Sequence, residues 1–198
     1  MVKTIIFDLG NVIVKVDRTS MYKKWAEKSN KEVKNITDYY SQLNAKTDFE
    51  KGKLTPKEFY QKVAAGIGLR MNFAEFKESY CNIFELNKNV AGVIKKLKKH
   101  YRLVLLSNTD KLHFDYIKNK FNIINIFDEH VLSYEIGKRK PNPLIFVEAI
   151  KKCKTSPFNC MYFDDMLEFI IVARLMGVKA FQFKDYHKLV DDLKNLEY

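Results

Sequence analysis

Five short apolar runs constrain the fold of this 198-residue chain more than any other feature of its sequence. Each run is four to six residues long, and most of them are followed directly by polar or charged side chains. Runs this short and this apolar are typical of strands that are buried on both faces of a parallel sheet. The predicted strands are Val2–Phe7, Arg102–Leu106, Glu129–Ser133, Cys160–Phe163 and Val178–Phe183.

Amphipathic helical patterns lie between these runs. Apolar residues recur with the spacing of one helix face in Val90–Leu97, Phe146–Ile150, Ile170–Gly177 and Leu189–Leu196. Strands that alternate with helices favour a parallel sheet, because the right-handed crossover connection places each helix against the sheet. The sequence therefore predicts an α/β fold with a Rossmann-like parallel sheet.

Residues 16–86 interrupt this alternation and show no convincing strand. Their aromatic residues fit several helices, and Thr55, Pro56 and Glu58 form the start signal of one of them. We expect an inserted, all-helical cap domain at 16–86, and a core domain made of residues 1–15 and 87–198. Trp25 and the other cap aromatics either pack inside the cap or stack on a sugar or base.

Reactive side chains follow three of the predicted strands. Asp8 follows the first strand, Ser107 and Asn108 the second, and Asp164 and Asp165 the fourth. In an open α/β sheet, ligands bind beyond the carboxyl ends of the strands. Each residue alone could be a turn or helix-capping residue, but their joint order favours a shared site.

The same residues, together with Lys140 in the loop after the third strand, suit phosphoryl transfer. The Asp8 carboxylate can act as a nucleophile and form an aspartyl-phosphate. Several carboxylates repel one another unless a hard cation lies between them, and Mg²⁺ prefers such oxygen ligands. A hydroxyl group and the Lys140 ammonium can hold the phosphoryl oxygens as negative charge develops.

Four segments resemble the four motifs of haloacid dehalogenase (HAD) superfamily hydrolases. They are Phe7–Ile13, Leu106–Thr109, Gly137–Pro143 and Tyr162–Asp165. The resemblance covers nearly the whole chain and is specific for the superfamily. The segment Glu50–Leu54, which leads into Glu58 and Phe59, is similar to the cap of a glucose-1-phosphate phosphatase-like branch.

This resemblance implies a role for each residue of the motifs. Asp8 would be the nucleophile and a metal ligand. The Gly10 backbone carbonyl and Asp165 would be further metal ligands, and Asp164 would be either a ligand or a support for the metal site. Ser107 and Asn108 would bind the phosphate, and Lys140 would neutralise the charges of Asp8 and the phosphate. The implied activity is a Mg²⁺-dependent phosphatase acting on a small phosphorylated metabolite, with sugar phosphates favoured. The cap would exclude water and select the leaving group.

Two positions depart from the pattern of the family. Most of its phosphatases carry a general acid–base Asp where this chain has Gly10, and Asp17 is a distant candidate substitute. Related sequences often have Asn or Asp at the position of Phe169, and that polar side chain supports the metal site or the lysine. A weakened enzyme, or a relative that only binds a phospho-ligand or a protein, therefore stays open. A metal-independent dehalogenase is disfavoured, because Asp164 and Asp165 would be an uncompensated pair of like charges.

Several other side chains allow two interpretations. His113 could line the pocket, although a helix-surface position is the simpler expectation. Arg139 could contact a substrate anion, although a solvent-facing side chain is the simpler expectation. Asp110 and Asp115 are expected to be charges at the start of a helix.

Composition excludes other classes of protein. The net charge of +11 comes from 35 basic and 24 acidic residues, but only five of the basic residues are Arg, so solvated lysine faces are favoured over specific nucleic-acid binding. No apolar run is long enough for a transmembrane helix, and the first residues do not resemble a signal peptide. We expect a cytoplasmic monomer or homodimer that acts on a small-molecule phosphate ester. The three cysteines are expected to be free thiols.

Overall fold

The computed structural model, which describes residues 1–194 and 196, contains a five-stranded parallel sheet. Its strands lie in the order β5-β4-β1-β6-β7, and every neighbouring pair is parallel. Their bounds are β1 Thr4–Phe7, β4 Arg102–Ser107, β5 Glu129–Leu132, β6 Cys160–Asp164 and β7 Lys179–Gln182. All five predicted strands are present, and their ends lie within two residues of the predicted ones. The predicted α/β class is confirmed.

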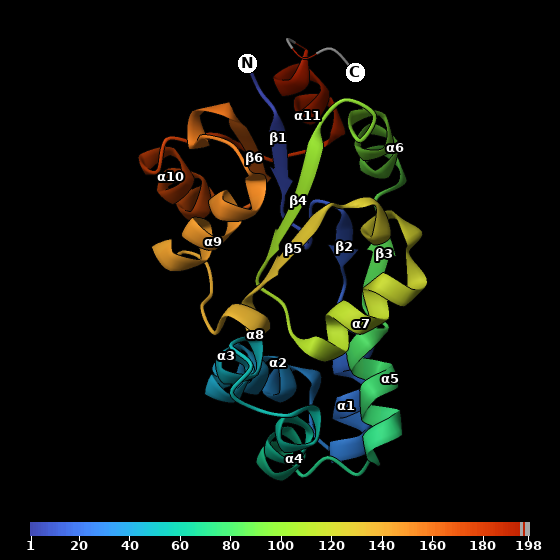
Figure 1. The fold of residues 1–198 in the computed structure, drawn as a ribbon. Helices are drawn as coiled ribbons and strands as arrows, with labels where there is room; N and C mark the ends of the chain where they lie inside the picture. The colour runs from blue at the N-terminus through green and yellow to red at the C-terminus, as the bar shows by residue number, and fades with distance from the viewer. Residues whose placement is uncertain (195, 197–198) are drawn as a thin grey trace.

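Helices cover both faces of the sheet (Figure 1). On one face, a buried apolar cluster joins the sheet to α6 (Lys88–Leu97), α7 (Lys111–Lys120) and α11 (Tyr186–Leu193). On the other face, a second cluster joins it to α9 (Pro143–Cys153) and α10 (Leu167–Leu175). The last helix ends at Leu193, so the predicted extension of this helix to Leu196 is wrong.

Five helices of the insertion lie beyond the carboxyl ends of the strands (Figure 1). They are α1 Thr19–Ser29, α2 Val33–Ser41, α3 Asn44–Glu50, α4 Pro56–Ile67 and α5 Phe73–Cys81. Trp25 is fully buried in their apolar cluster, and its indole N–H donates to Ser79 Oγ at 3.0 Å. The packing interpretation of Trp25 is therefore confirmed. The capping box of Thr55 and Glu58 forms as predicted at the start of α4.

A two-stranded ribbon connects the insertion to the sheet. Strand β2 (Val14–Val16) pairs antiparallel with β3 (Phe84–Leu86), so the expectation that 16–86 contains no strand is wrong at both of its ends. Three-residue strands carry too few residues for an alternating pattern, and only their pairing across the chain makes them strands. The division into a core and a cap domain at residues 15/16 and 86/87 stays a prediction.

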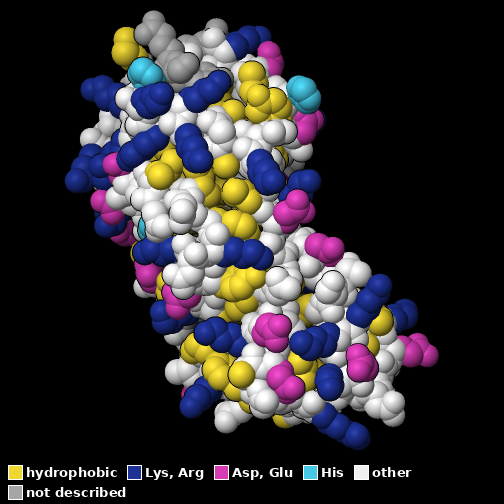
Figure 2. Space-filling model, turned by 90° about the vertical axis from the view of Figure 1, so that its right-hand side faces the viewer, with side chains coloured by type: hydrophobic (Ala, Val, Ile, Leu, Met, Phe, Trp, Pro, Cys, Tyr) yellow, Lys and Arg dark blue, Asp and Glu magenta, His cyan; other side chains and the backbone are white. Residues whose placement is uncertain are grey.

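The remaining elements are short: α8 (Ser133–Ile136) and two 3₁₀ turns, η1 (Asn122–Ile126) and η2 (Pro157–Asn159). All three cysteines are free and buried, as predicted. Among the described residues, no helix is both long and apolar enough to cross a membrane. Lys and Arg side chains are spread over the whole face seen in Figure 2, with Asp and Glu side chains among them.

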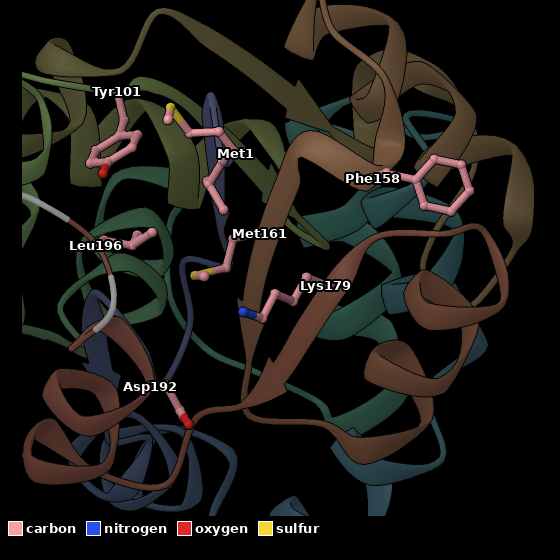
Figure 3. Close-up of a pocket in the computed structure, with 8 residues that line it drawn as sticks. Met1, Tyr101, Phe158, Met161, Lys179, Asp192 and Leu196 are labelled. Atoms are coloured by element: carbon pink, nitrogen blue, oxygen red, sulfur yellow. The ribbon is translucent and has the colours of Figure 1, made fainter.

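A cavity of about 420 Å³ lies at the amino ends of the strands (Figure 3). Met161, the second residue of β6, and Lys179, the first residue of β7, line it, and Tyr101 lies just before β4. The reactive residues predicted from the sequence follow the opposite, carboxyl ends of the strands. This cavity is therefore separate from the candidate active site.

Candidate active site

The central strands bring their carboxyl ends to one place. Strand β1 lies between β4 and β6, and Phe7 is in register with Leu105 on one side and Phe163 on the other. The next residue along β1, Asp8, is therefore level with Asp164 at the end of β6 and with Leu106 of β4, one residue before Ser107. Asp8 and Asp164, which the sequence placed at two separate strand exits, face the same few ångströms of space.

The Lys140 ammonium joins these two carboxylates. Its Nζ donates to Asp8 Oδ1 at 2.6 Å, to Asp164 Oδ2 at 2.6 Å and to the Leu106 carbonyl at 3.2 Å. The side chain is almost completely buried, so the ion pairs are shielded from water and from salt. The predicted convergence of Lys140 with Asp8 is thus present in the structure.

Asn108 fixes the backbone of the Lys140 loop. Its side-chain oxygen accepts from the Lys140 N–H at 2.8 Å, and its side-chain nitrogen donates to the Lys140 carbonyl at 3.0 Å. The carboxamide is therefore occupied by the protein itself. Ser107, the last residue of β4, is 2% exposed at the same edge of the sheet. Phosphate binding by Ser107 and Asn108 stays a prediction.

Three carboxylates form a cluster with the spacing of a metal site. One oxygen from each of Asp8, Asp164 and Asp165 lies within 4.8 Å of the others. Three negative charges face the single positive charge of Lys140, which leaves two negative charges uncompensated in a mostly buried place. A divalent cation balances this charge, and hard oxygen donors are the ligands that Mg²⁺ prefers. The donor set therefore fits magnesium, and Gly10 lies in the turn directly after Asp8.

Burial and charge shift the pKa values of this cluster. Burial raises the pKa of Asp8 to about 7; Asp164 adds to this rise, and Lys140 opposes it. Burial alone would lower the pKa of Lys140, but the charges of Asp8 and Asp164 raise it above its usual value. Burial also raises the pKa of the half-buried Asp165. Lys140 therefore stays protonated. The Asp8 carboxylate binds a proton more readily than an ordinary Asp, and a metal ion bound at the cluster would take the place of that proton.

Tyr162 is a site residue that the sequence analysis missed. Its hydroxyl makes a short hydrogen bond to Asp164 Oδ2 and also lies 3.2 Å from Lys140 Nζ. Since alternate residues of a strand point to the same face, its position two residues before Asp164 in β6 was an available signal. Asp164 Oδ1 accepts from the Met166 N–H at 2.9 Å, so both oxygens of Asp164 have protein partners. This favours a supporting role for Asp164, with Asp165 the more available ligand.

Two further contacts complete the site. Asn11, which was also missed, donates from Nδ2 to Asp165 Oδ2 at 3.1 Å and so orients that carboxylate. The Phe169 ring lies 5.0 Å from Lys140 Nζ, which is within cation–π range. In related sequences an Asn or Asp at this position often supports the lysine. Phe169 also contacts the lysine here, but through its aromatic ring and not through a hydrogen bond.

For the side chains that had two possible roles, the structure shows which contacts each one makes. Asp17 is exposed and accepts from the Thr19 N–H at the start of α1, which gives no support to a general-acid role. Asp110 caps α7, as expected, but the same expectation for Asp115 is wrong, because Asp115 lies beyond the first turn of that helix. The helix-surface expectation for His113 is wrong, because it is 8% exposed and lies between Asp110 and the Tyr80 carbonyl. Arg139 does not simply face solvent, since its Nε lies 2.6 Å from Glu50 Oε2.

Comparisons with known proteins agree with this geometry. The pattern that describes haloacid dehalogenase-like hydrolases matches residues 2–177. A D-ribitol-5-phosphate phosphatase of Bacteroides thetaiotaomicron is 29% identical over 189 residues, which cover 92% of each protein. The sesquiterpene phosphatase astK of Aspergillus oryzae is 23% identical and covers 98% of this chain and 96% of its own length.

A solved structure shares the whole fold. It is a HAD family enzyme, bt-2542, from Bacteroides thetaiotaomicron in complex with magnesium and inorganic phosphate. It superposes with a TM-score of 0.86 at 24% identity, and the match covers 96% of this chain and 99% of that one. At this identity the likeness shows the fold.

The chain belongs to the haloacid dehalogenase-like hydrolases, because their sequence pattern spans most of its length and the fold agrees. The predicted superfamily is confirmed. The finer expectation of a glucose-1-phosphate phosphatase-like branch finds no confirmation among these relatives.

Proposed function

We propose that this protein is a Mg²⁺-dependent phosphatase that hydrolyses a small phosphorylated metabolite through an aspartyl-phosphate on Asp8. The single observation that carries the proposal is the Lys140 ammonium at 2.6 Å from both Asp8 and Asp164, inside a cluster of three carboxylates. Such a cluster is costly to bury unless a cation balances its negative charge. Sugar phosphates and related polyol phosphates are favoured, because a similar protein is a D-ribitol-5-phosphate phosphatase.

Asp8, Asp165 and the Gly10 carbonyl would hold Mg²⁺, with Asp164 as a further ligand or as support. The ion would supply positive charge to the phosphoryl oxygens. The Asp8 carboxylate attacks phosphorus, an Asp8 oxygen–phosphorus bond forms, and the ester oxygen–phosphorus bond breaks. Water then hydrolyses the acyl phosphate and regenerates the Asp8 carboxylate.

Lys140 and the end of β4 act on the phosphoryl group itself. The Lys140 ammonium orients Asp8 and offsets the charge that the phosphoryl group brings. Ser107 and the backbone of Asn108 lie at the adjacent strand exit and would bind phosphoryl oxygens. Gly10 cannot protonate the departing alkoxide, so the leaving group takes its proton from water or from a substrate hydroxyl. Esters with good leaving groups should therefore react fastest.

The insertion at 16–86 would act as a cap over the strand ends, as its place in Figure 1 suggests. The protein would act as a monomer or a homodimer on a small-molecule ester in the cytoplasm, without binding nucleic acid.

A second candidate is a weakened or binding-only relative. Both oxygens of Asp164 already accept hydrogen bonds, from Lys140, Tyr162 and the Met166 N–H. This favours the second candidate, because it leaves fewer free ligand atoms for a metal. Together with Gly10 and Phe169, this would lower turnover without changing the fold.

The test is phosphate release from p-nitrophenyl phosphate and a panel of sugar and polyol phosphates, with magnesium or with a chelator. Wild-type protein should release phosphate only with magnesium, and Asp8→Asn should abolish the release. Asp115→Asn is the matched control, because Asp115 is an exposed residue of α7 that pairs with Lys111. Equal residual turnover in the wild type and in Asp8→Asn would favour the second candidate.

A further inference from the structure

A buried serine holds the chain that follows the carboxyl end of β4. The backbone ladder between β4 and β5 ends at the pair Ser107 and Leu132. The next residue after β5 is Ser133, which is fully buried and begins α8. Its hydroxyl accepts from the Thr109 N–H at 3.0 Å and donates to the Thr109 carbonyl at 2.9 Å. One side chain thus binds both polar backbone groups of a residue beyond the end of the ladder.

Other strand exits of the sheet are held by the backbone itself. After β1, the Asp8 N–H donates to the Phe163 carbonyl at 2.9 Å. After β7, the Phe183 N–H donates to the Asp164 carbonyl at 2.8 Å. Each of these bonds extends a strand pair by one step. At the exit of β4 the Ser133 hydroxyl has this role, so a side chain holds the segment that carries the predicted phosphate-binding residues.

Asn108, which directly precedes Thr109, makes the same kind of contact with a more distant loop. Its side chain accepts from the Lys140 N–H at 2.8 Å and donates to the Lys140 carbonyl at 3.0 Å. A side chain holds such a loop in one place only if its own backbone is fixed. Ser133 fixes that backbone at the adjacent residue. The two contacts therefore form one chain, from Ser133 through Thr109 and Asn108 to Lys140.

The residue at the end of this chain needs precise placement. Lys140 Nζ lies 2.6 Å from both Asp8 Oδ1 and Asp164 Oδ2, and the Lys140 side chain is almost completely buried. A shift of about 1 Å in a reacting group can lower a rate by about 10²-fold. The contacts of the Ser133 hydroxyl are with the Thr109 backbone, so its influence on Lys140 passes through Asn108.

We propose that Ser133 is a positioning residue for the reaction at Asp8. Its hydroxyl fixes the Thr109 backbone and, with it, the adjacent Asn108. Asn108 in turn fixes the loop whose Lys140 ammonium contacts Asp8. This inference rests on the proposed function for the reaction itself. A purely structural serine would contribute to stability without changing the placement of Lys140.

Hydrogen exchange and turnover of Ser133→Ala test the proposal together. Ala occupies nearly the same space but removes both bonds to Thr109. NMR should show exchange of the Lys140 N–H about tenfold faster than in the wild type, beyond any change in global stability. The kcat for p-nitrophenyl phosphate should fall about 10–100-fold. Ser133→Cys should lie between Ala and the wild type in both measurements, because a thiol is a weaker donor and acceptor than a hydroxyl.

Ser79→Ala is the matched control. Ser79 is a buried serine of α5 whose hydroxyl also makes two hydrogen bonds, from the Trp25 indole N–H at 3.0 Å and to the Phe76 carbonyl at 2.9 Å. It has no contact with the chain that leads to Lys140. This variant should lose a comparable amount of stability in urea denaturation, with the Lys140 exchange and kcat unchanged.

The two measurements also separate this proposal from the proposed function. An unchanged Lys140 exchange or an unchanged kcat in Ser133→Ala would overturn the positioning role, as would equal losses in Ser79→Ala. If Ser133→Ala does not fold, the comparison of Ser133→Cys with the wild type decides in the same way. Faster Lys140 exchange in a protein whose wild type releases no phosphate would support the link from Ser133 to Lys140 and reject the phosphatase.

Discussion

Two polar regions of this molecule lie side by side and differ in how completely their groups are paired. Around Lys140, the ammonium, one oxygen of Asp8 and both oxygens of Asp164 have protein partners within hydrogen-bond distance. Around Glu50, the pairing is less well aligned, because Arg139 Nε lies 2.6 Å from Glu50 Oε2 without directing its N–H at that oxygen. Fixed partners suit chemistry that is the same for every phosphate ester, because preorganised groups need no rearrangement during reaction.

The largest effect should come from removing the ammonium of the paired region. Lys140→Met leaves the carboxylates of Asp8 and Asp164 buried without a positive charge. Breaking a buried ion pair in this way typically costs about 3–5 kcal/mol. Urea denaturation should show this loss in metal-free protein, and magnesium should recover more stability in the variant than in the wild type. An unchanged denaturation midpoint would mean that the pairing around Lys140 is unimportant.

The second effect concerns the missing general acid. A Cβ at Gly10 would meet only Val16 at 3.8 Å, and its φ is not positive, so a side chain fits there without strain. Gly10→Asp should raise kcat for alkyl phosphates by about 10²-fold, the lower range of general acid catalysis. The gain should be much smaller for p-nitrophenyl phosphate, whose leaving group needs no proton. A Gly10→Asn control should show no gain, and equal gains in both variants would contradict the explanation.

A smaller effect should come from Tyr162. Tyr162→Phe removes the hydroxyl that bonds to Asp164 and Lys140 but keeps the ring. Losses in such supporting contacts typically lower activity about 10–100-fold. We expect the lower end of this range in kcat, with little change in KM, because Tyr162 is 1% exposed and its hydroxyl is directed at Asp164 and Lys140. A change in KM alone would place this hydroxyl in substrate binding.

The smallest effect should appear on the side of the insertion, as a dependence of stability on pH. Burial acts to raise the pKa of Asp110, but its contacts with His113 and Tyr80 outweigh this and lower the pKa. A lowered folded-state pKa gives stability above the unfolded pKa of about 3.9, and this stability disappears as pH falls through the folded value.

Asp110→Asn should therefore lower the free energy of unfolding by about 1–3 kcal/mol at neutral pH, as expected for unpaired buried partners. The difference from the wild type should shrink as the pH falls below about 4. Urea denaturation across this pH range measures it. A difference that is independent of pH would mean that the Asp110 carboxylate is not the stabilising species.

The paired region could be predicted largely from the sequence. Asp8 and Asp164 each stand at the end of an apolar run, and parallel strands bring such ends to one edge of the sheet. Tyr162 was missed because its polar tip lies in an otherwise apolar strand. The partners of Asn108 were missed because a side chain that binds the backbone of a distant loop leaves no local pattern.

The contacts around Tyr40 and Glu50 could not be predicted in the same way. Arg18, Tyr40, Glu50 and Arg139 come from four separate segments, and none of these segments has a motif that specifies the others. Only the packing of the insertion against the sheet brings them together. Arg139 alone was recognised, as a residue that could contact a substrate anion. The three-residue strands β2 and β3 were missed for the same reason, since each exists only through its pairing with the other.

The most direct test of the central claim is to find where the phosphoryl group resides during turnover. Protein that is acid-quenched during turnover of a phosphate ester with magnesium is digested, and its peptides are analysed by mass spectrometry. A phosphoryl adduct on the peptide that contains Asp8, absent when a chelator is added and absent in Asp8→Asn, is the predicted result. Steady release of phosphate with no adduct on Asp8, or with an adduct on another residue, would contradict the account.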